Sequence, residues 1–167
     1  MLAPRGRLAT AVSRWALLRG APAVSEPAER FTNDYLGYLL GQANHALFKD
    51  FDAQVREAGL GSLEWRVLAV LSGDSPLSVG ALAQEVLSQQ PTVTKLLQRL
   101  LAQGWVAMQA DPADQRRTLV AITAAGQRKV APLMRRAREH EAQVLGALSA
   151  AEVQRLKRQL RELAQPR

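Results

Sequence analysis

Apolar residues recur every three or four positions near both ends of this chain, and that spacing predicts amphipathic helices. One helix is expected over residues 33–59 and another over residues 127–148. A third starts at Ser149, which forms a capping box with Glu152. The apolar stripes of these helices need a surface to pack against. That surface is either the core of the same chain or a second copy, and stripes on both sides of a small central region favour a dimer.

The pattern in the middle of the chain is shorter and more interrupted. A helix is expected over residues 62–73, with Ser62 as its cap. A short helix follows from Ser78, and Ser88 is expected to cap another that ends at Gly104. The last of these presents one apolar face, which is expected to consist of Val93, Leu97, Leu100 and Leu101.

Two strands are expected after these helices, over residues 105–110 and 117–123. The sequence Asp-Pro-Ala-Asp at 111–114 is typical of the turn that would join them. Two short helices followed by a hairpin have the layout of a winged helix-turn-helix, which places one helix in the DNA major groove. The predicted fold class is therefore mainly α with a small β-hairpin wing, and further helices flank the winged core.

The outward face of the helix after Ser88 is polar and cationic. Its glutamine side chains suit adenine, its threonines suit the thymine methyl group, and Lys95 suits guanine or phosphate. A solvated surface would show the same pattern, but the neighbouring short helix and hairpin favour DNA contact. The expected DNA-binding residues are Ser88, Gln89, Gln90, Thr92, Thr94, Lys95, Gln98 and Arg99, with Arg116 and Arg117 from the hairpin loop.

The hairpin loop places Asp114 two residues before Arg116. The carboxylate is expected to pair with the guanidinium and hold it extended, as insertion into a narrow minor groove requires. Arg117 would add a phosphate contact. A polar turn with incidental charges is the plainer alternative for this segment.

Composition narrows the class of protein further. The chain has 167 residues, a net charge of +7, no cysteine and two histidines. Thiol chemistry is therefore excluded, and no motif of a nucleophile, metal site or phosphate-binding loop occurs, so no enzyme, catalytic residue, metal or cofactor is predicted. The basic surplus favours a polyanion, and a basic helical module for RNA or membrane surfaces stays open. No apolar run is long enough to span a membrane, and a cytoplasmic location is expected.

The first residues differ from the rest of the chain. Residues 1–25 carry four arginines and no acidic residue, and prolines separate them from the first helix. We expect residues 1–30 to form a basic, flexible extension and residues 31–167 to form a single domain. Within it, residues 62–126 are expected to be the DNA-binding lobe, and residues 33–58 and 127–165 the dimerisation helices.

The segment from Gln90 to Leu97, QPTVTKLL, and the wing phrase DPADQR at 111–116 resemble the MarR (multiple antibiotic resistance regulator) family of transcription factors. The Ile122-Thr123 pair followed by Gly126 and the LSAAE start of the last helix match as well. The similarity covers about residues 33–164. The family wing more often has Arg where this chain has Gln115, which leaves the Asp114–Arg116 pair intact.

The resemblance implies a dimer built from the terminal helices, with an effector pocket between these helices and the DNA-binding lobe. Side chains suited to a small aromatic carboxylate are Tyr38, Asn44, His45, Trp65 and Arg66. The plainer alternatives are core packing for Tyr38 and Trp65, an ion pair with an acidic residue for Arg66, and a satisfied interface position for His45.

The predicted function is a ligand-responsive, homodimeric repressor of transcription. It would bind a pseudo-palindromic operator in double-stranded DNA and be released by a small aromatic acid. The alternative is a constitutive nucleic-acid-binding helical module without an effector.

Overall fold

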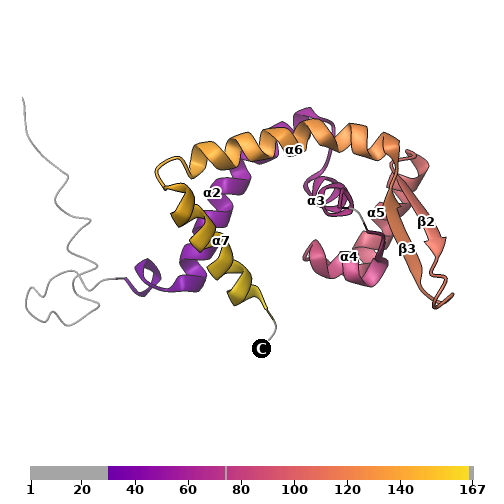
Figure 1. Ribbon diagram of the computed structural model, residues 1–167, viewed down its shortest axis with the longest axis horizontal. Helices are drawn as coiled ribbons and strands as arrows, with labels where there is room; N and C mark the ends of the chain where they lie inside the picture. The colour runs from indigo at the N-terminus through magenta and orange to yellow at the C-terminus, as the bar shows by residue number, and fades with distance from the viewer. Residues whose placement is uncertain (1–29, 74, 166–167) are drawn as a thin grey trace, which may run out of the picture. The chain divides into compact units, whose positions relative to one another are not determined.

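The computed structural model describes residues 30–73 and 75–165 (Figure 1). They belong to two compact units, one reaching Gln42 and the other beginning at Ala43. All but the last residue of the predicted extension at 1–30 lies outside the described residues. The elements in chain order are η1 (Phe31–Asn33), α2 (Leu36–Glu57), α3 (Ser62–Leu71), β1 (Leu77–Ser78), α4 (Val79–Glu85), α5 (Gln90–Ala102), β2 (Val106–Ala110), β3 (Thr118–Ile122), α6 (Ala124–Val144) and α7 (Ala150–Ala164).

The first unit contains η1 and the first turns of α2. The Phe31 and Tyr35 rings stack with their centroids 4.8 Å apart. The apolar side chains of this part of α2 remain exposed, including Leu36 at 51% and Leu39 at 44%.

The core of the second unit is shared by α3, α4, α5, β3 and α6. Leu68, Leu82, Leu97, Val120 and Val130, one from each of these elements, have no exposed surface. Burial of such a side chain contributes about 1.5–3 kcal/mol, so this core fixes α4 and α5 against the sheet.

The sheet is antiparallel, in the order β1-β3-β2. Val106 pairs with Ile122 and Ala110 with Thr118, so β2 and β3 form the predicted hairpin, while Leu77 pairs with Val120. The mainly α fold with a small β wing is thereby confirmed. Strand β1 was missed because two residues are too few to show the alternation of a strand.

Four predicted helix starts are wrong by one to three residues, and the first of these helices, α2, begins at Leu36 instead of residue 33. Gly61 and Gln89, rather than Ser62 and Ser88, are the N-cap residues of α3 and α5, and neither makes a side-chain cap. Helix α6 begins before Gly126, because the Thr123 hydroxyl accepts the Gly126 N–H at 3.1 Å.

The expected inward face of α5 also needs one correction. Leu96 is 3% exposed and belongs to the core, whereas Leu101 is 46% exposed. The other three residues of that face, Val93, Leu97 and Leu100, are buried as predicted. Because successive residues of a helix are rotated by about 100°, the buried face of α5 is centred on the side that carries Leu96.

The capping box at the start of α7 is confirmed. The Ser149 N–H donates to Glu152 Oε2 at 2.8 Å, and the Ser149 hydroxyl accepts the Glu152 N–H at 3.4 Å. The hydroxyl of Ser149, and then its N–H, hold the pKa of the Glu152 carboxyl below its ordinary value. This contribution to helix stability is therefore present above the ordinary pKa of a glutamate and is lost as the pH falls through the lowered pKa.

Among the described residues, no helix is both long and apolar enough to cross a membrane.

Candidate nucleic-acid interface and aromatic cavity

Helices α4 and α5 meet at a tight turn. Leu87 closes α4 in the left-handed region, with φ at 50°, and its N–H donates to the Gln84 carbonyl at 3.0 Å. The Ser88 N–H donates to the Ala83 carbonyl at 2.9 Å, so the chain leaves α4 and enters α5 within a few residues. Pro91 falls in the first turn of α5, where its missing N–H costs little.

The polar face of α5 lies mostly on the surface. Gln89, Gln90, Thr92, Lys95, Gln98 and Arg99 are exposed. Ser88 and Thr94 are half-buried, and the Thr94 hydroxyl donates to the Gln90 carbonyl at 2.9 Å. Six of the eight expected contacts on this helix are therefore free to meet another molecule.

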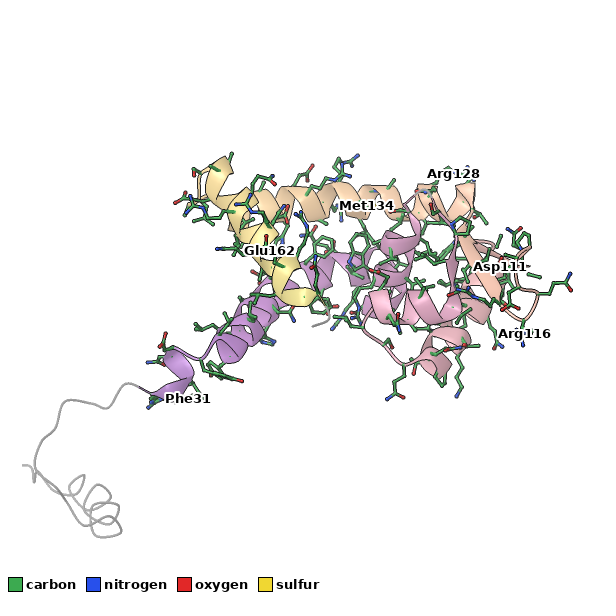
Figure 2. The ribbon with its side chains drawn as sticks, turned by 60° about the horizontal axis from the view of Figure 1, so that its bottom comes forward. Phe31, Asp111, Arg116, Arg128, Met134 and Glu162 are labelled. Atoms are coloured by element: carbon green, nitrogen blue, oxygen red, sulfur yellow. The ribbon has the colours of Figure 1, made fainter. Side chains whose placement is uncertain are left out.

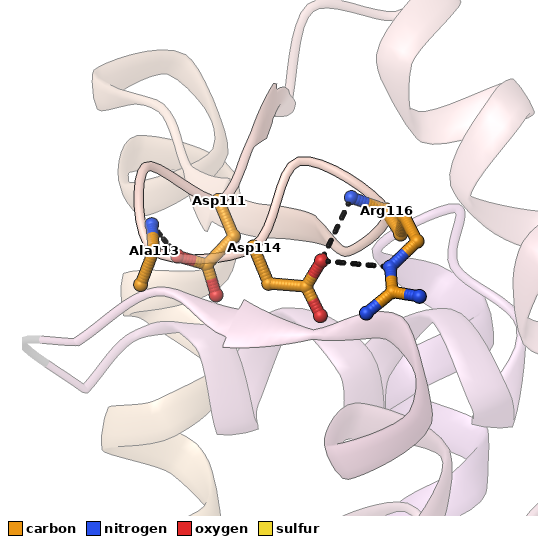
Figure 3. A network of polar contacts seen from close by, with 4 residues as sticks. All are labelled: Asp111, Ala113, Asp114 and Arg116. Carbon is orange, nitrogen blue, oxygen red and sulfur yellow. Dashed lines mark hydrogen bonds and ion pairs between the residues drawn. The ribbon is translucent and has the colours of Figure 1, made fainter.

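The hairpin loop between β2 and β3 carries Asp111 and Arg116 (Figure 2). The Asp111 carboxylate accepts the Ala113 N–H at 2.9 Å and shapes the turn. Asp114 Oδ1 accepts both the backbone N–H of Arg116 at 3.1 Å and its Nε at 3.2 Å (Figure 3). The Arg116 side chain is 93% exposed. Asp114 therefore holds the Nε side of the guanidinium, and within residues 30–73 and 75–165 the two outer nitrogens have no hydrogen-bond partner. An ion pair this exposed adds little stability.

Glu64 is a residue that the sequence reasoning missed. It lies on α3, and its Oε1 is 3.4 Å from Nη2 of Arg99 on α5. Together with Thr92 and Lys95, these two residues line a hollow of about 560 Å³. A carboxylate three residues after Gly61 signals a helix start in the sequence, but nothing in the sequence indicates its reach to α5.

A second hollow is aromatic. Its volume is about 190 Å³, and its lining comes from α2, α3 and α6. The ring of Phe51 lies 5.4 Å from that of Trp65 and 5.9 Å from that of His140, centroid to centroid. The remaining lining residues are Asn44, Leu47, Phe48 and Ala137. We refer to this hollow as the aromatic cavity.

The four predicted effector residues of the second unit, Asn44, His45, Trp65 and Arg66, do not line one hollow. Asn44 and Trp65 line the aromatic cavity, but His45 lines a different hollow with Lys49, Asp52 and Arg56. The reason is that consecutive residues of a helix point 100° apart. Arg66 does not line the cavity either, and its buried Nε has no hydrogen-bond partner among the residues that the structure describes. Tyr38 belongs to the first unit and is 44% exposed.

The sequence profile of the MarR family matches residues 58–117, which span α3 to the wing. Two curated relatives match at greater length. The transcriptional repressor IacR of Pseudomonas putida is 27% identical over 127 residues, which are 76% of each chain. The transcriptional activatory protein BadR of Rhodopseudomonas palustris is 31% identical over 122 residues, covering 71% of this chain and 70% of BadR.

Solved structures agree in fold. The MarR family regulator SPO1453 from Silicibacter pomeroyi DSS-3 is 31% identical, with a TM-score of 0.71, covering 82% of this chain and 100% of that one. NadR in complex with 4-hydroxyphenylacetate is 26% identical, with a TM-score of 0.73 and coverage of 88% and 100%. The chain belongs to the MarR family of transcriptional regulators.

Proposed function

We propose that this chain is a homodimeric repressor that binds a pseudo-palindromic operator and is released by a small aromatic acid. The observation that carries the proposal is the exposed polar face of α5 beside an arginine held in the loop of the wing. As a regulator of transcription it would act in the cytoplasm. Repression, as opposed to activation, is the more specific part of the proposal, because the relatives include both a repressor and an activator.

The chemistry of the two elements suits duplex DNA. The amides of Gln90 and Gln98 offer the paired donor and acceptor that adenine requires, and Lys95 suits guanine or phosphate. Arg116, held by Asp114 but otherwise exposed, suits a narrow and electronegative minor groove. Helix and wing would thus read neighbouring grooves of one half-site.

Exposed apolar residues support the homodimer. Helix α7 buries no residue, and Leu156, Leu160 and Leu163 are 38%, 38% and 53% exposed. Contiguous apolar surface of this kind marks an interaction site on a protein. A two-fold dimer would present two recognition helices, and its operator would share that symmetry.

Arg116→Ala is expected to weaken operator binding by about 5–150-fold, since a groove contact contributes roughly 1–3 kcal/mol. The free energy of unfolding should stay within about 0.5 kcal/mol of the wild type, because the side chain is exposed. Fluorescence anisotropy with an operator duplex measures the affinity. Arg138→Ala removes the same charge from an exposed position on α6 and is the matched control. Equal losses in the two variants would contradict a specific wing contact.

The aromatic cavity is the proposed effector site. Its volume of about 190 Å³ suits a single ring, which Phe51 and Trp65 would flank. Asn44 and His140 could bond a ring substituent or the carboxylate, since both line the cavity. The complex of NadR with 4-hydroxyphenylacetate supports this class of ligand.

A panel of benzoates, hydroxycinnamates and nicotinates is expected to contain a member that lowers operator affinity about 5–150-fold, the usual range of coupling between two sites. Trp65→Leu should abolish that response and retain operator binding. His45→Ala should keep the response, because His45 lines a different hollow. The measurement is a titration of each acid into the protein–operator complex. A panel in which no acid shifts the affinity would leave the alternative, a constitutive DNA-binding module.

A further inference from the structure

We propose that Glu64 is a positioning residue that orients Arg99 toward a DNA phosphate. This inference rests on the proposed DNA binding and concerns how α3 supports the recognition helix α5. Glu64 itself touches no nucleic acid in the proposal and acts through Arg99.

The two carboxylate oxygens of Glu64 have separate partners. Oε2 accepts the Gly61 N–H at 2.7 Å and so caps α3, while Oε1 lies 3.4 Å from Nη2 of Arg99. The Glu64 side chain is only 16% exposed, whereas that of Arg99 is 69% exposed. The Glu64 end of the ion pair is therefore fixed by α3, whereas the Arg99 end is mostly exposed to solvent.

The surroundings of Arg99 suit a phosphate. Pro91, Thr92 and Lys95 from the first turns of α5 line the same hollow of about 560 Å³ as Glu64 and Arg99. A long arginine side chain loses rotamer freedom when it grips a ligand, and a carboxylate that fixes one donor reduces that loss. Asp114 holds Arg116 in a comparable way at the wing.

Because Glu64 is negatively charged, the direction in which its removal changes DNA affinity tests the proposal. A carboxylate beside a polyanion repels it, so removal of a negative charge from this lobe should by itself strengthen DNA binding. If Glu64 positions Arg99, its removal should instead weaken binding.

Glu64→Gln tests this directly. The amide oxygen can still accept the Gly61 N–H, and the amide NH₂ then faces Arg99 in place of a carboxylate oxygen. We expect operator affinity to fall about fivefold or more. The slope of log affinity against log salt should become shallower by about 0.9, the value for one phosphate contact. Arg99→Gln should reproduce both changes, and the double variant should add no more than about twofold, because residues acting as one unit are not additive.

Glu85→Gln is the matched control, because it removes the same charge from an exposed position on α4. It is expected to leave operator affinity unchanged or to raise it slightly, with the salt slope preserved. A folding defect in Glu64→Gln would weaken binding equally in the presence and absence of Arg99, so the double variant separates it from positioning.

The inference is overturned if Glu64→Gln binds the operator as tightly as the wild type or more tightly, or if its effect adds fully to that of Arg99→Gln. In either case Arg116→Ala still tests the proposed function by itself. Failure of the wild type to bind any duplex in a salt-dependent way would instead contradict the proposed function.

Discussion

Gly126→Ala is expected to destabilise the protein by about 3 kcal/mol, the upper end of the usual cost of overpacking. A Cβ atom at this position would lie 2.1 Å from the Trp105 carbonyl oxygen and 2.7 Å from Ile122 Cγ1. The carbonyl has little freedom to move, because it already accepts the Thr123 N–H at 3.0 Å. The clash would push α6 away from the base of the wing.

Thermal unfolding measures this effect, and the midpoint should fall by roughly 6–12 °C for a chain of this size. Gly80→Ala is the control, since a Cβ there meets only Gln90 Oε1 at 3.7 Å and alanine favours a helix. It should leave the midpoint unchanged or raise it. A Gly126→Ala protein as stable as the wild type would contradict the packing described for this junction.

Leu160→Glu is expected to dissociate the proposed dimer and thereby to abolish tight operator binding. Leu160 is 38% exposed, so a two-fold interface buries only that part of each leucine, and the main cost of the substitution is bringing two carboxylates into an apolar interface. A buried, unpaired carboxylate costs several kcal/mol, so association should weaken by roughly 100-fold or more. A monomer has one recognition helix and one wing, so its affinity for a two-site operator should fall steeply.

Sedimentation equilibrium at micromolar concentration measures the dissociation. Gln154→Glu is the control, because it introduces the same charge on the polar side of α7. That variant should remain dimeric and bind the operator. A Leu160→Glu protein that stays dimeric would show that α7 does not form the interface.

Local sequence patterns predicted most of the fold for physical reasons. The spacing of apolar residues predicted the order of the helices and of the two hairpin strands, and the structure has the same order from α2 to α7. Two features of the fold have no local signal in the sequence. Strand β1 exists only because Leu77 pairs with Val120 across the fold. The left-handed Leu87 replaces the glycine or asparagine that usually marks such a turn.

For the candidate sites, the sequence predicted the contact within one loop but not the contacts between helices. The Asp114–Arg116 contact lies within one loop, and spacing alone suggested it. The aromatic cavity joins Phe51, Trp65 and His140 from three helices, and no sequence pattern connects them. The contact of Glu64 with Arg99 likewise depends on how α3 packs against α5. Sequence periodicity shows which face of a helix is buried, but not which distant residue meets it.

The claim that this chain binds duplex DNA specifically as a dimer is tested by selecting duplexes from a random library. Binding of the enriched site is then measured across a range of salt concentrations. We expect a pseudo-palindromic site with half-sites about one helical turn apart, occupied by two protein chains. Its affinity should fall with salt by about 0.9 log units per neutralised phosphate for each tenfold rise in concentration. A library that yields no enriched sequence, or a site occupied by one chain with salt-independent affinity, would contradict it.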